Sequence, residues 1–369
     1  AADPLAPWQI LFSSGTTGDP KGIVMHQRRY LENALATRVL CGYTPEDRPY
    51  TGLSFTHANA QVLTLGSCLA QGMRGVFSRR FTKSRLWDIA RAFGCTTFNL
   101  LGGMTTAIYA EPQLPDDADN PVRFVLSAGM PTAIWADFER RFDLKVLEFY
   151  GAAEGGLTFN PIGVGPVGSI GRPVPSLKHR IVDAEGRDVA PDARGERVGE
   201  LLFQNADGTP MKVEYFGDPE ASAKKSREGW LWMGDVVRED AQGWLYFLHR
   251  AGGSLRRNGA FVEPALIEKL IAEDPAVDDV YVYGVPAANG VPGEKDIVAA
   301  VVPLLPQAVN SFDAQPLFRR CRAALEPNSV PTYIQVLAEI PKTASEKPQD
   351  RFLLEAFANQ PARVHTERR

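Results

Sequence analysis

A segment rich in glycine and hydroxyl side chains near the start of the chain has the composition of a phosphate-binding loop. It reads SSGTTGDPKG over residues 13–22 and follows the apolar run WQILF. Glycines let backbone N–H groups approach an anion, while hydroxyls and a lysine add donors and positive charge. The spacing differs from that of a Walker A loop, because Lys21 is followed by a glycine. We expect anion contacts from Ser13, Ser14, Gly15, Thr16, Thr17, Gly18 and Lys21.

Two carboxylates farther along the chain are candidates for a nucleotide site. Glu154 follows Tyr150 just after the apolar run LKVLEF, and Asp235 ends the segment WLWMGD. A carboxylate that follows a strand and faces a phosphate loop is suited to binding Mg²⁺, and a tyrosine can stack on a base. A carboxylate can also accept hydrogen bonds from both hydroxyls of a ribose, which suits Asp235. The alternative in both cases is an ordinary acidic residue in a surface turn.

The segments that must position these residues alternate between apolar runs and helical patterns. Strands are expected at 8–14, 74–78, 96–101, 122–127 and 144–149, and helices at 27–41, 58–71, 83–93 and 131–141. Strand and helix in alternation with short connections predict an α/β fold with a parallel sheet covered on both faces. Ligands of such sheets bind beyond the carboxyl ends of the strands. The loops after residues 13, 127 and 149 are therefore the expected place for chemistry.

The pattern changes twice after this region. Short segments of β character (LKHRIVD, GELLFQN, GWLWMGD and GWLYFLH) predict an antiparallel subdomain or a small barrel. After the paired glycines Gly252 and Gly253, helices at 263–273 and 312–325 and strands at 278–285, 295–303 and 333–338 predict a compact α/β domain. We therefore expect an α/β part over 1–165, a β-rich part over 166–249, a hinge at 250–253 and a C-terminal domain over 254–369.

Composition excludes several classes of protein. The 369 residues suggest two or three globular domains, and the net charge of −4 without runs of like charge gives no support to nucleic-acid or membrane-surface binding. No apolar run is long enough to span a membrane. The four cysteines stand far apart without zinc-site spacing, which predicts free thiols and a cytoplasmic location. The first residues, AADPLAP, contain neither an initiator methionine nor the basic region of a signal peptide.

Five segments taken together resemble the signatures of the adenylate-forming enzymes, in the order that this superfamily keeps. They are SSGTTGDPKG (13–22), FYGAAE (149–154), WLWMGD (230–235), LHRAGGSLRRNG (248–259) and IPKTASEK (340–347). The superfamily includes acyl-CoA synthetases, peptide-synthetase adenylation domains and luciferases. The resemblance covers essentially the whole chain. It implies a large N-terminal domain, incomplete at its start, followed by a small mobile C-terminal domain.

The resemblance also implies roles for individual residues. It assigns Mg²⁺ to Glu154, adenine to Tyr150, ribose to Asp235, ribose or phosphates to Arg250, and the acyl carboxylate and α-phosphate to the catalytic Lys347. Further cofactor contacts are expected from Ser127, Ala128, Gly129, Gly151, Ala152 and, for a pantetheine arm, Gly259. The expected acyl pocket contains His57, Asn59, Gly102 and Met104, and the hinge contains Gly252 and Gly253.

The activity implied by the resemblance is ATP-dependent activation of a carboxylic acid to an acyl adenylate, followed by thioester formation with coenzyme A. ATP, Mg²⁺ and coenzyme A are the implied cofactors, and a homodimer is compatible with it. The pocket residues favour a small, aryl or modestly polar acid, as in carnitine- or aryl-CoA ligases. One alternative is an adenylating domain that loads a carrier protein. Another is a catalytically impaired homologue, because the chain departs from the signatures at Ala153, Met233, Gly252 and Glu346.

The start of the chain carries one more expectation. Members of the superfamily have a long stretch before the phosphate loop, whereas here the loop begins at residue 13. We therefore expect residues 1–369 to be the C-terminal majority of a longer enzyme. Its α/β sheet should then expose apolar surface where the preceding stretch would pack.

Overall fold

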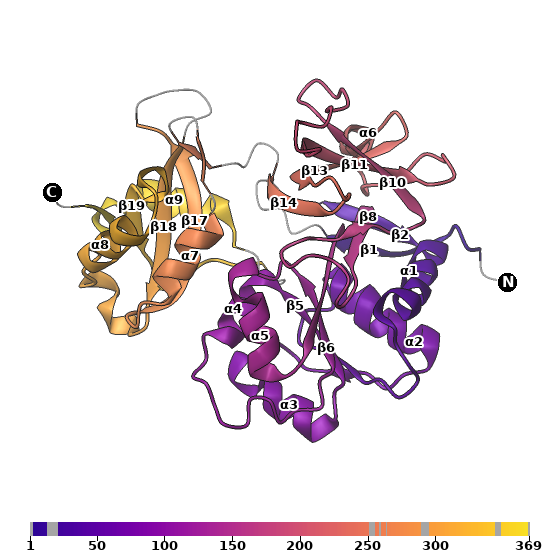
Figure 1. The fold of residues 1–369 in the computed structure, drawn as a ribbon, viewed down its shortest axis with the longest axis horizontal. Helices are drawn as coiled ribbons and strands as arrows, with labels where there is room; N and C mark the ends of the chain where they lie inside the picture. The colour runs from indigo at the N-terminus through magenta and orange to yellow at the C-terminus, as the bar shows by residue number, and fades with distance from the viewer. Residues whose placement is uncertain are drawn as a thin grey trace. The chain divides into compact units, whose positions relative to one another are not determined.

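The computed structural model describes residues 3–12, 21–250, 255–257, 260–262, 264–288, 295–343 and 348–367. These residues form two compact units, the first ending at Arg250 and the second beginning at Leu255 (Figure 1). Each unit has a sheet and an apolar core of its own. The mixed α/β fold predicted from the sequence is confirmed.

The main sheet of the first unit has seven strands in the order β4-β3-β5-β6-β7-β8-β9. Neighbouring strands from β4 to β7 run parallel, while β8 and β9 continue the sheet in antiparallel fashion. The strands are β3 (Pro49–Thr51), β4 (Val76–Phe77), β5 (Thr97–Leu101), β6 (Phe124–Ala128), β7 (Lys145–Ala152), β8 (Gly155–Asn160) and β9 (Arg172–Pro173). Four of the five strands predicted for the sheet are therefore present, together with β3 and the two antiparallel strands, which the sequence did not reveal.

Helices cover both faces of this sheet, as expected for parallel strands. One face packs against α3 (Leu86–Phe93), α4 (Gly102–Tyr109) and α5 (Trp135–Phe142), through a core that includes Phe98 and Phe138. The other face packs against α1 (Gln27–Cys41) and α2 (Ser67–Gln71), where Cys41 and Cys68 meet Leu126. All four cysteines of the chain are buried and free.

One predicted strand lies elsewhere. Residues 8–14 were expected to join the parallel sheet, but β1 (Pro7–Phe12) pairs antiparallel with β2 (Gly22–His26) in a separate two-stranded sheet, so that prediction is wrong. The burial pattern gives the reason, because Leu11 is buried while Trp8 and Phe12 are exposed. A strand inside a parallel sheet would be covered on both sides. The two strands flank residues 13–21, which contain most of the predicted phosphate loop.

The β-rich part of the first unit is a five-stranded antiparallel sheet. Its strands are β10 (Leu177–Val182), β11 (Arg197–Asn205), β12 (Ser226–Arg227), β13 (Trp230–Glu239) and β14 (Leu245–Arg250). The short helix α6 (Pro219–Lys225) precedes β12, and the Asp218 side chain caps its first turn. The core of this sheet includes Phe203 and Met233, and Tyr150 and Ala152 of β7 pack against it. The main sheet and this five-stranded sheet therefore meet at the end of β7.

The second unit is a four-stranded sheet with helices on both faces. Its strands are β17 (Val277–Pro286), β18 (Lys295–Pro303), β19 (Tyr333–Val336) and β20 (Val364–Thr366), in that order across the sheet. One core contains Ile267 of α7 (Pro264–Ala272) and Phe318 of α8 (Gln315–Ala324), and a second contains Leu353 of α9 (Asp350–Asn359). Two-residue strands β15 (Arg256–Arg257) and β16 (Ala260–Phe261) pair separately. None of the helices in the described ranges is long and apolar enough to cross a membrane.

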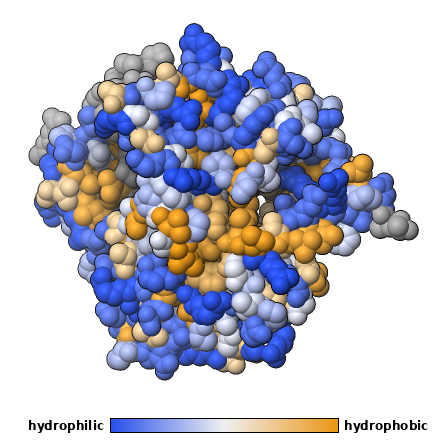
Figure 2. Space-filling view, turned by 45° about the vertical axis from the view of Figure 1, so that its right-hand side comes forward, coloured by the Kyte–Doolittle hydropathy of each residue, from blue (hydrophilic) through white to orange (hydrophobic). Residues whose placement is uncertain are grey.

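Apolar side chains gather on one side of the first unit, which Figure 2 brings forward. Leu31, Leu35 and Val39 lie on one face of α1, spaced by one helical turn, and all three are exposed. Leu69 of α2 and Trp8 of β1 are exposed as well. Exposed apolar side chains therefore lie on α1, α2 and β1, and Phe77 of the edge strand β4 is a further one on the main sheet.

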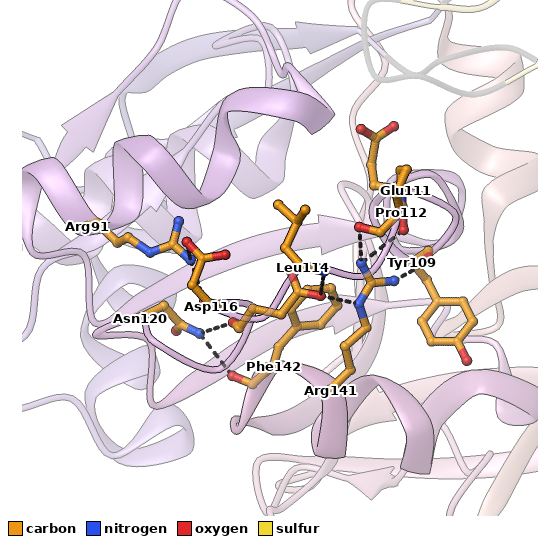
Figure 3. Close-up of polar contacts among 10 residues, drawn as sticks. Arg91, Tyr109, Glu111, Pro112, Leu114, Asp116, Asn120, Arg141 and Phe142 are labelled. Atoms are coloured by element: carbon orange, nitrogen blue, oxygen red, sulfur yellow. Dashed lines mark hydrogen bonds and ion pairs between the residues drawn. The ribbon is translucent and has the colours of Figure 1, made fainter.

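Two arginines hold the long connection between α4 and β6. Arg91 of α3 donates to the carbonyls of Asp116 and Asp119 (both 2.6 Å), and Arg141 makes the larger set of contacts. Arg141 of α5 donates from Nε to Asp117 Oδ2 (2.7 Å), from Nη1 to the Tyr109 carbonyl (2.7 Å) and from Nη2 to the carbonyls of Glu111 (2.9 Å) and Pro112 (3.0 Å) (Figure 3). The Asp117 side chain is almost completely buried. All three nitrogens of this guanidinium therefore donate to the end of α4 or to the connection that follows it.

We predict that Arg141→Met lowers the free energy of unfolding by about 3 kcal/mol, because it leaves the Asp117 carboxylate buried without a counter-charge. The neighbouring Arg140 is a matched control, since it forms an exposed pair with Asp137. Arg140→Met should cost much less. Urea unfolding followed by tryptophan fluorescence measures both, because all six tryptophans lie in the first unit. Equal losses in the two variants would contradict the assigned role of Arg141.

Candidate active site

The predicted site residues divide into those that the structure describes and those outside its described ranges. Outside them lie Ser13, Ser14, Gly15, Thr16, Thr17, Gly18, Gly252, Gly253, Gly259 and Lys347. The described residues include Lys21, Tyr150, Glu154, Asp235 and Arg250. Lys21 directly precedes β2, whereas the other four come from β7, β13, β14 and the segment after β7, where the main sheet meets the five-stranded sheet.

Two of the predicted nucleotide contacts, Tyr150 and Arg250, meet at the carboxylate of a third, Asp235. The Tyr150 hydroxyl of β7 donates a hydrogen bond to Asp235 Oδ2 of β13, although the two residues are 85 positions apart. Arg250 Nε lies 3.0 Å from Asp235 Oδ1, and the two residues are register partners across β13 and β14. Asp235 is only 2% exposed, whereas Arg250 is largely exposed. Burial and the neighbouring Asp235 charge raise the pKa of Tyr150, so its hydroxyl stays protonated and remains a donor.

Glu154 lies among polar and cationic side chains, some of which the sequence did not reveal. The Tyr215 hydroxyl donates to Glu154 Oε1 at 2.8 Å, and Lys21 Nζ lies 5.3 Å from the centre of the Tyr215 ring. Arg29 of α1 donates to the carbonyl of Ala153 at 2.5 Å. Burial lowers the pKa of Arg29, and the Glu154 charge opposes this effect. Glu154 is therefore held in place by a hydroxyl and influenced by a nearby guanidinium.

A second cation approaches the same site from the β-rich part. Lys225, the last residue of α6, donates from Nζ to the Met233 carbonyl at 3.0 Å. Burial lowers its pKa, while the charges of Glu154 and Asp235 favour its protonated form. In the sequence Lys225 belongs to the polar stretch AKKSRE, which is typical of a solvated helix end. Neither Lys225 nor Tyr215 carries a local signal, because only the pairing of distant strands brings them to Glu154.

The loop after β6 is held by a buried carboxylate. Glu148 of β7 accepts hydrogen bonds from the backbone N–H groups of Gly129 (2.6 Å) and Met130 (3.1 Å). Gly129 has φ +100°, a conformation that favours glycine. The loop joins the predicted contacts Ser127, Ala128 and Gly129, so Glu148 positions them. A lone glutamate inside the apolar run LKVLEF was the signal available in the sequence.

The predicted acyl-pocket residues lie on segments that begin next to the main sheet. His57 Nδ1 accepts a hydrogen bond from the Asn59 N–H at 3.1 Å, and Asn59 begins the π-helical segment η1 (Asn59–Gly66). Gly102 begins α4, directly after β5. Met104 is 3% exposed and belongs to the same apolar core as Ala60. The helix predicted at 58–71 is therefore present, but its first turns are π-helical, a form that often occurs at functional sites.

Glu154 is the described residue best suited to a metal. No group of three or more His, Cys, Asp or Glu side chains could hold an ion by itself in the described ranges. Mg²⁺ does not require such a group, because it commonly binds through one or two carboxylates together with substrate phosphates and water. One Glu154 oxygen accepts a hydrogen bond from the Tyr215 hydroxyl, which fixes the orientation of the carboxylate for binding a metal ion. The residues present therefore fit Mg²⁺ that arrives with a phosphate ligand.

We predict that Glu148 makes stability depend on pH. Burial raises its pKa to about 8, against the opposing effect of its backbone hydrogen bonds, whereas the ordinary value is 4.5. Between these values the folded form holds a proton that the unfolded form has lost, so the contribution of Glu148 to stability falls as pH rises. The slope approaches about 1.4 kcal/mol per pH unit. Relative to Glu148→Gln, the wild type should lose stability from about pH 5 to 8 and level off above.

Urea unfolding of both proteins at several pH values measures this difference. Glu268 of α7 offers a comparison, because burial raises its pKa to about 7. The difference in unfolding free energy between wild type and Glu268→Gln should therefore level off at a pH about one unit lower than for Glu148→Gln. A difference between wild type and Glu148→Gln that does not change with pH would contradict the prediction.

Comparison with known proteins agrees with this arrangement. Residues 1–209 match the family model of the AMP-binding enzymes, and residues 266–347 match that of the AMP-binding enzyme C-terminal domain. A steroid-22-oyl-CoA synthetase of Rhodococcus jostii is 29% identical over 94% of this chain and 63% of its own length. A sulfoacetate–CoA ligase of Cupriavidus necator is 31% identical over 96% of this chain and 69% of its own length. The chain thus spans about two thirds of these relatives.

A solved structure shares the fold. The O-succinylbenzoate coenzyme A synthetase of Bacillus subtilis, in complex with ATP and a magnesium ion, aligns with 95% of this chain and 70% of its own. The TM-score is 0.75 at 24% sequence identity. The first family model matches more than half of the chain, which shows the family. The chain belongs to the AMP-binding enzyme family.

Proposed function

We propose that this chain activates a carboxylic acid with ATP and then transfers the acyl group to the thiol of coenzyme A. The observation that carries the proposal is the convergence of Tyr150 and Arg250 on the buried carboxylate of Asp235, close to the end of β7. These are the residues to which the sequence resemblance gives adenine, ribose and phosphate. The acids named for the relatives, a steroid acid and sulfoacetate, are chemically unlike each other. The acid that this chain takes must therefore be inferred from its own pocket.

The first half-reaction joins two anions, and the charges of the site suit it. A carboxylate oxygen attacks the α-phosphorus of ATP, the bond to the bridging oxygen breaks, and pyrophosphate leaves. Reactants that repel each other must be held together, and the negative charge must be offset by groups already in place. Arg29 and Lys225 are such groups near Glu154. Mg²⁺, with Glu154 as its protein ligand, would neutralise phosphate charge.

The second half-reaction needs a different arrangement. The thiol sulfur attacks the acyl carbon, the bond to the phosphate oxygen breaks, and AMP leaves. Lys347, proposed for the first step, belongs to the C-terminal part of the chain, as does Gly259, proposed for the pantetheine arm. We propose that this domain turns about Gly252 and Gly253 between the two steps, as the resemblance implies. A homodimer and a cytoplasmic location stay predictions.

ATP–pyrophosphate exchange with a panel of acids tests the proposal. The panel holds benzoate, hexanoate, dodecanoate and sulfoacetate, each with ATP and Mg²⁺. Exchange that depends on one of these acids is the expected result. Lys347→Ala should reduce it by about 10²–10³, the usual loss for one preorganised charge, while thioester formation from supplied acyl adenylate is largely kept.

Lys342→Ala is the matched control, because Lys342 pairs with Asp279 at 2.6 Å within the second unit. This variant should change both half-reactions only slightly. ATP binding without exchange for any acid would instead favour a catalytically impaired homologue. Exchange followed by transfer only to a phosphopantetheinylated carrier protein, and not to coenzyme A, would favour an adenylating domain. Equal loss of both half-reactions in Lys347→Ala would contradict the role given to that lysine.

A further inference from the structure

Two asparagines lie buried between the main sheet and the segment η1. Asn99 stands in the middle of β5 and is 2% exposed, and Asn59 begins η1 and is 5% exposed. Asn99 Nδ2 donates to Asn59 Oδ1 and also to Thr64 Oγ1, the latter at 2.8 Å. These side-chain partners are all neutral. The pair is therefore a small buried polar group without a charged side-chain partner among the hydrogen bonds of the described residues.

Each asparagine keeps one amide atom without a partner. Asn59 Nδ2 and Asn99 Oδ1 are both buried and have no hydrogen bond within the described part of the chain. Rotating both amides by 180° would exchange nitrogen and oxygen, and Asn99 Oδ1 would then accept from Asn59 and from Thr64. One donor and one acceptor would still be left over. The unmet donor and acceptor are therefore a property of the pair and not of how the amides were oriented.

Buried polar atoms in proteins almost always have partners, and leaving one without a partner is costly. Two apolar side chains of similar size would fill the same space without this cost. The location also points to a ligand. Asn59 is one of the predicted acyl-pocket residues, and β5 runs from Asn99 through Leu101 into Gly102 and Met104 of the same predicted pocket. The unmet atoms thus belong to the region where the acyl group is expected.

We propose that Asn59 and Asn99 select carboxylic acids that carry a neutral polar group away from the carboxylate, such as a hydroxyl or a carboxamide. Both groups supply the acceptor that Asn59 Nδ2 lacks and the donor that Asn99 Oδ1 lacks. A second charged group would be buried beside neutral partners only, at high cost. This inference rests on the proposed function, because it names the class of acid which that reaction takes. A pocket built to meet a hydroxyl discriminates strongly against the analogue that lacks it.

Matched acids test the inference. Benzoate is compared with 4-hydroxybenzoate and 4-carbamoylbenzoate, hexanoate with 6-hydroxyhexanoate, and terephthalate supplies the charged case. Binding is measured by calorimetry in the presence of AMP, and turnover by pyrophosphate exchange. The wild type should favour a neutral polar acid over its apolar partner by at least about tenfold, and terephthalate should bind poorly.

Two variants separate selectivity from stability. The double variant Asn59→Leu/Asn99→Leu replaces both partners at once, so it leaves no half of the pair unsatisfied, and it should reverse the preference toward the apolar acids. Thr64→Val removes only the hydroxyl that Asn99 Nδ2 meets, so it should lower stability but keep the preference. If a buried water bridges the pair instead, wild type and double variant should have the same ratio of affinities for the matched polar and apolar acids. This result would overturn the inference.

The binding measurement keeps this test apart from that of the proposed function. Binding preference without exchange for any acid would contradict the proposed reaction and support the selectivity. Exchange without preference between matched acids would support the reaction and overturn the selectivity. Absence of binding by every acid in the panel would overturn the selectivity as well.

Discussion

The buried carboxylate of Asp235 is the constraint on which the rest of the site depends. A carboxylate can be buried only when it is paired and hydrogen-bonded, because the cost of removing it from water is otherwise too high. The Tyr150 hydroxyl meets one of its oxygens and the Arg250 guanidinium lies beside the other. Since Tyr150 belongs to the main sheet and Asp235 to the β-rich sheet, this contact fixes how the two sheets of the first unit meet. The residues expected to touch the three parts of a nucleotide are thereby brought together.

This arrangement also links binding of the nucleotide to the site's own hydrogen bonds. A ribose that donates to Asp235 must share the carboxylate with the Tyr150 hydrogen bond at Oδ2 and the Arg250 ion pair at Oδ1, and Oδ1 has no hydrogen bond within the described residues. Arg250 is largely exposed and so can change its contact at little cost, whereas the buried Tyr150 hydroxyl has much less freedom. We therefore expect Arg250 to move toward phosphate when ribose binds and Tyr150 to stay. Glu154 lies farther along the segment FYGAAE than Tyr150, and the hydrogen bond from the Tyr215 hydroxyl fixes its carboxylate as well.

The sequence predicted the elements well where local pattern decides them. The helix at 27–41 has the predicted bounds, and four of the five segments expected as strands of the main sheet are there. The fifth, β1, was assigned to the wrong sheet, because an apolar run predicts a strand but not its partner. Antiparallel β8 was missed since its glycine-rich start resembles a turn. Tyr150 and Asp235 could be predicted as site residues because their signatures are contiguous in the sequence, and the structure brings the two side chains together.

Other parts of the site depend on contacts between distant segments and had no such signal. Tyr215 and Glu154 are 61 positions apart, and Lys225 resembles an ordinary surface lysine. Glu148 and Asn99 are each a single polar residue within an apolar run. The sequence therefore marks them as unusual but does not show which residues they contact. Such residues become meaningful only when strand register places them, as the pairing of β7 with β6 places Glu148 beside the loop after Ala128.

The central claim is that the Asp235 carboxylate is the ribose contact of a nucleotide site, and binding of AMP tests it most directly. Calorimetric titration with AMP requires neither an acid nor a metal, so it isolates this contact. Asp235→Asn should weaken AMP binding by about 10- to 100-fold, the value of a hydrogen bond to a charged group, with the fold kept as judged by circular dichroism. Unchanged AMP affinity in a folded Asp235→Asn protein would contradict the account.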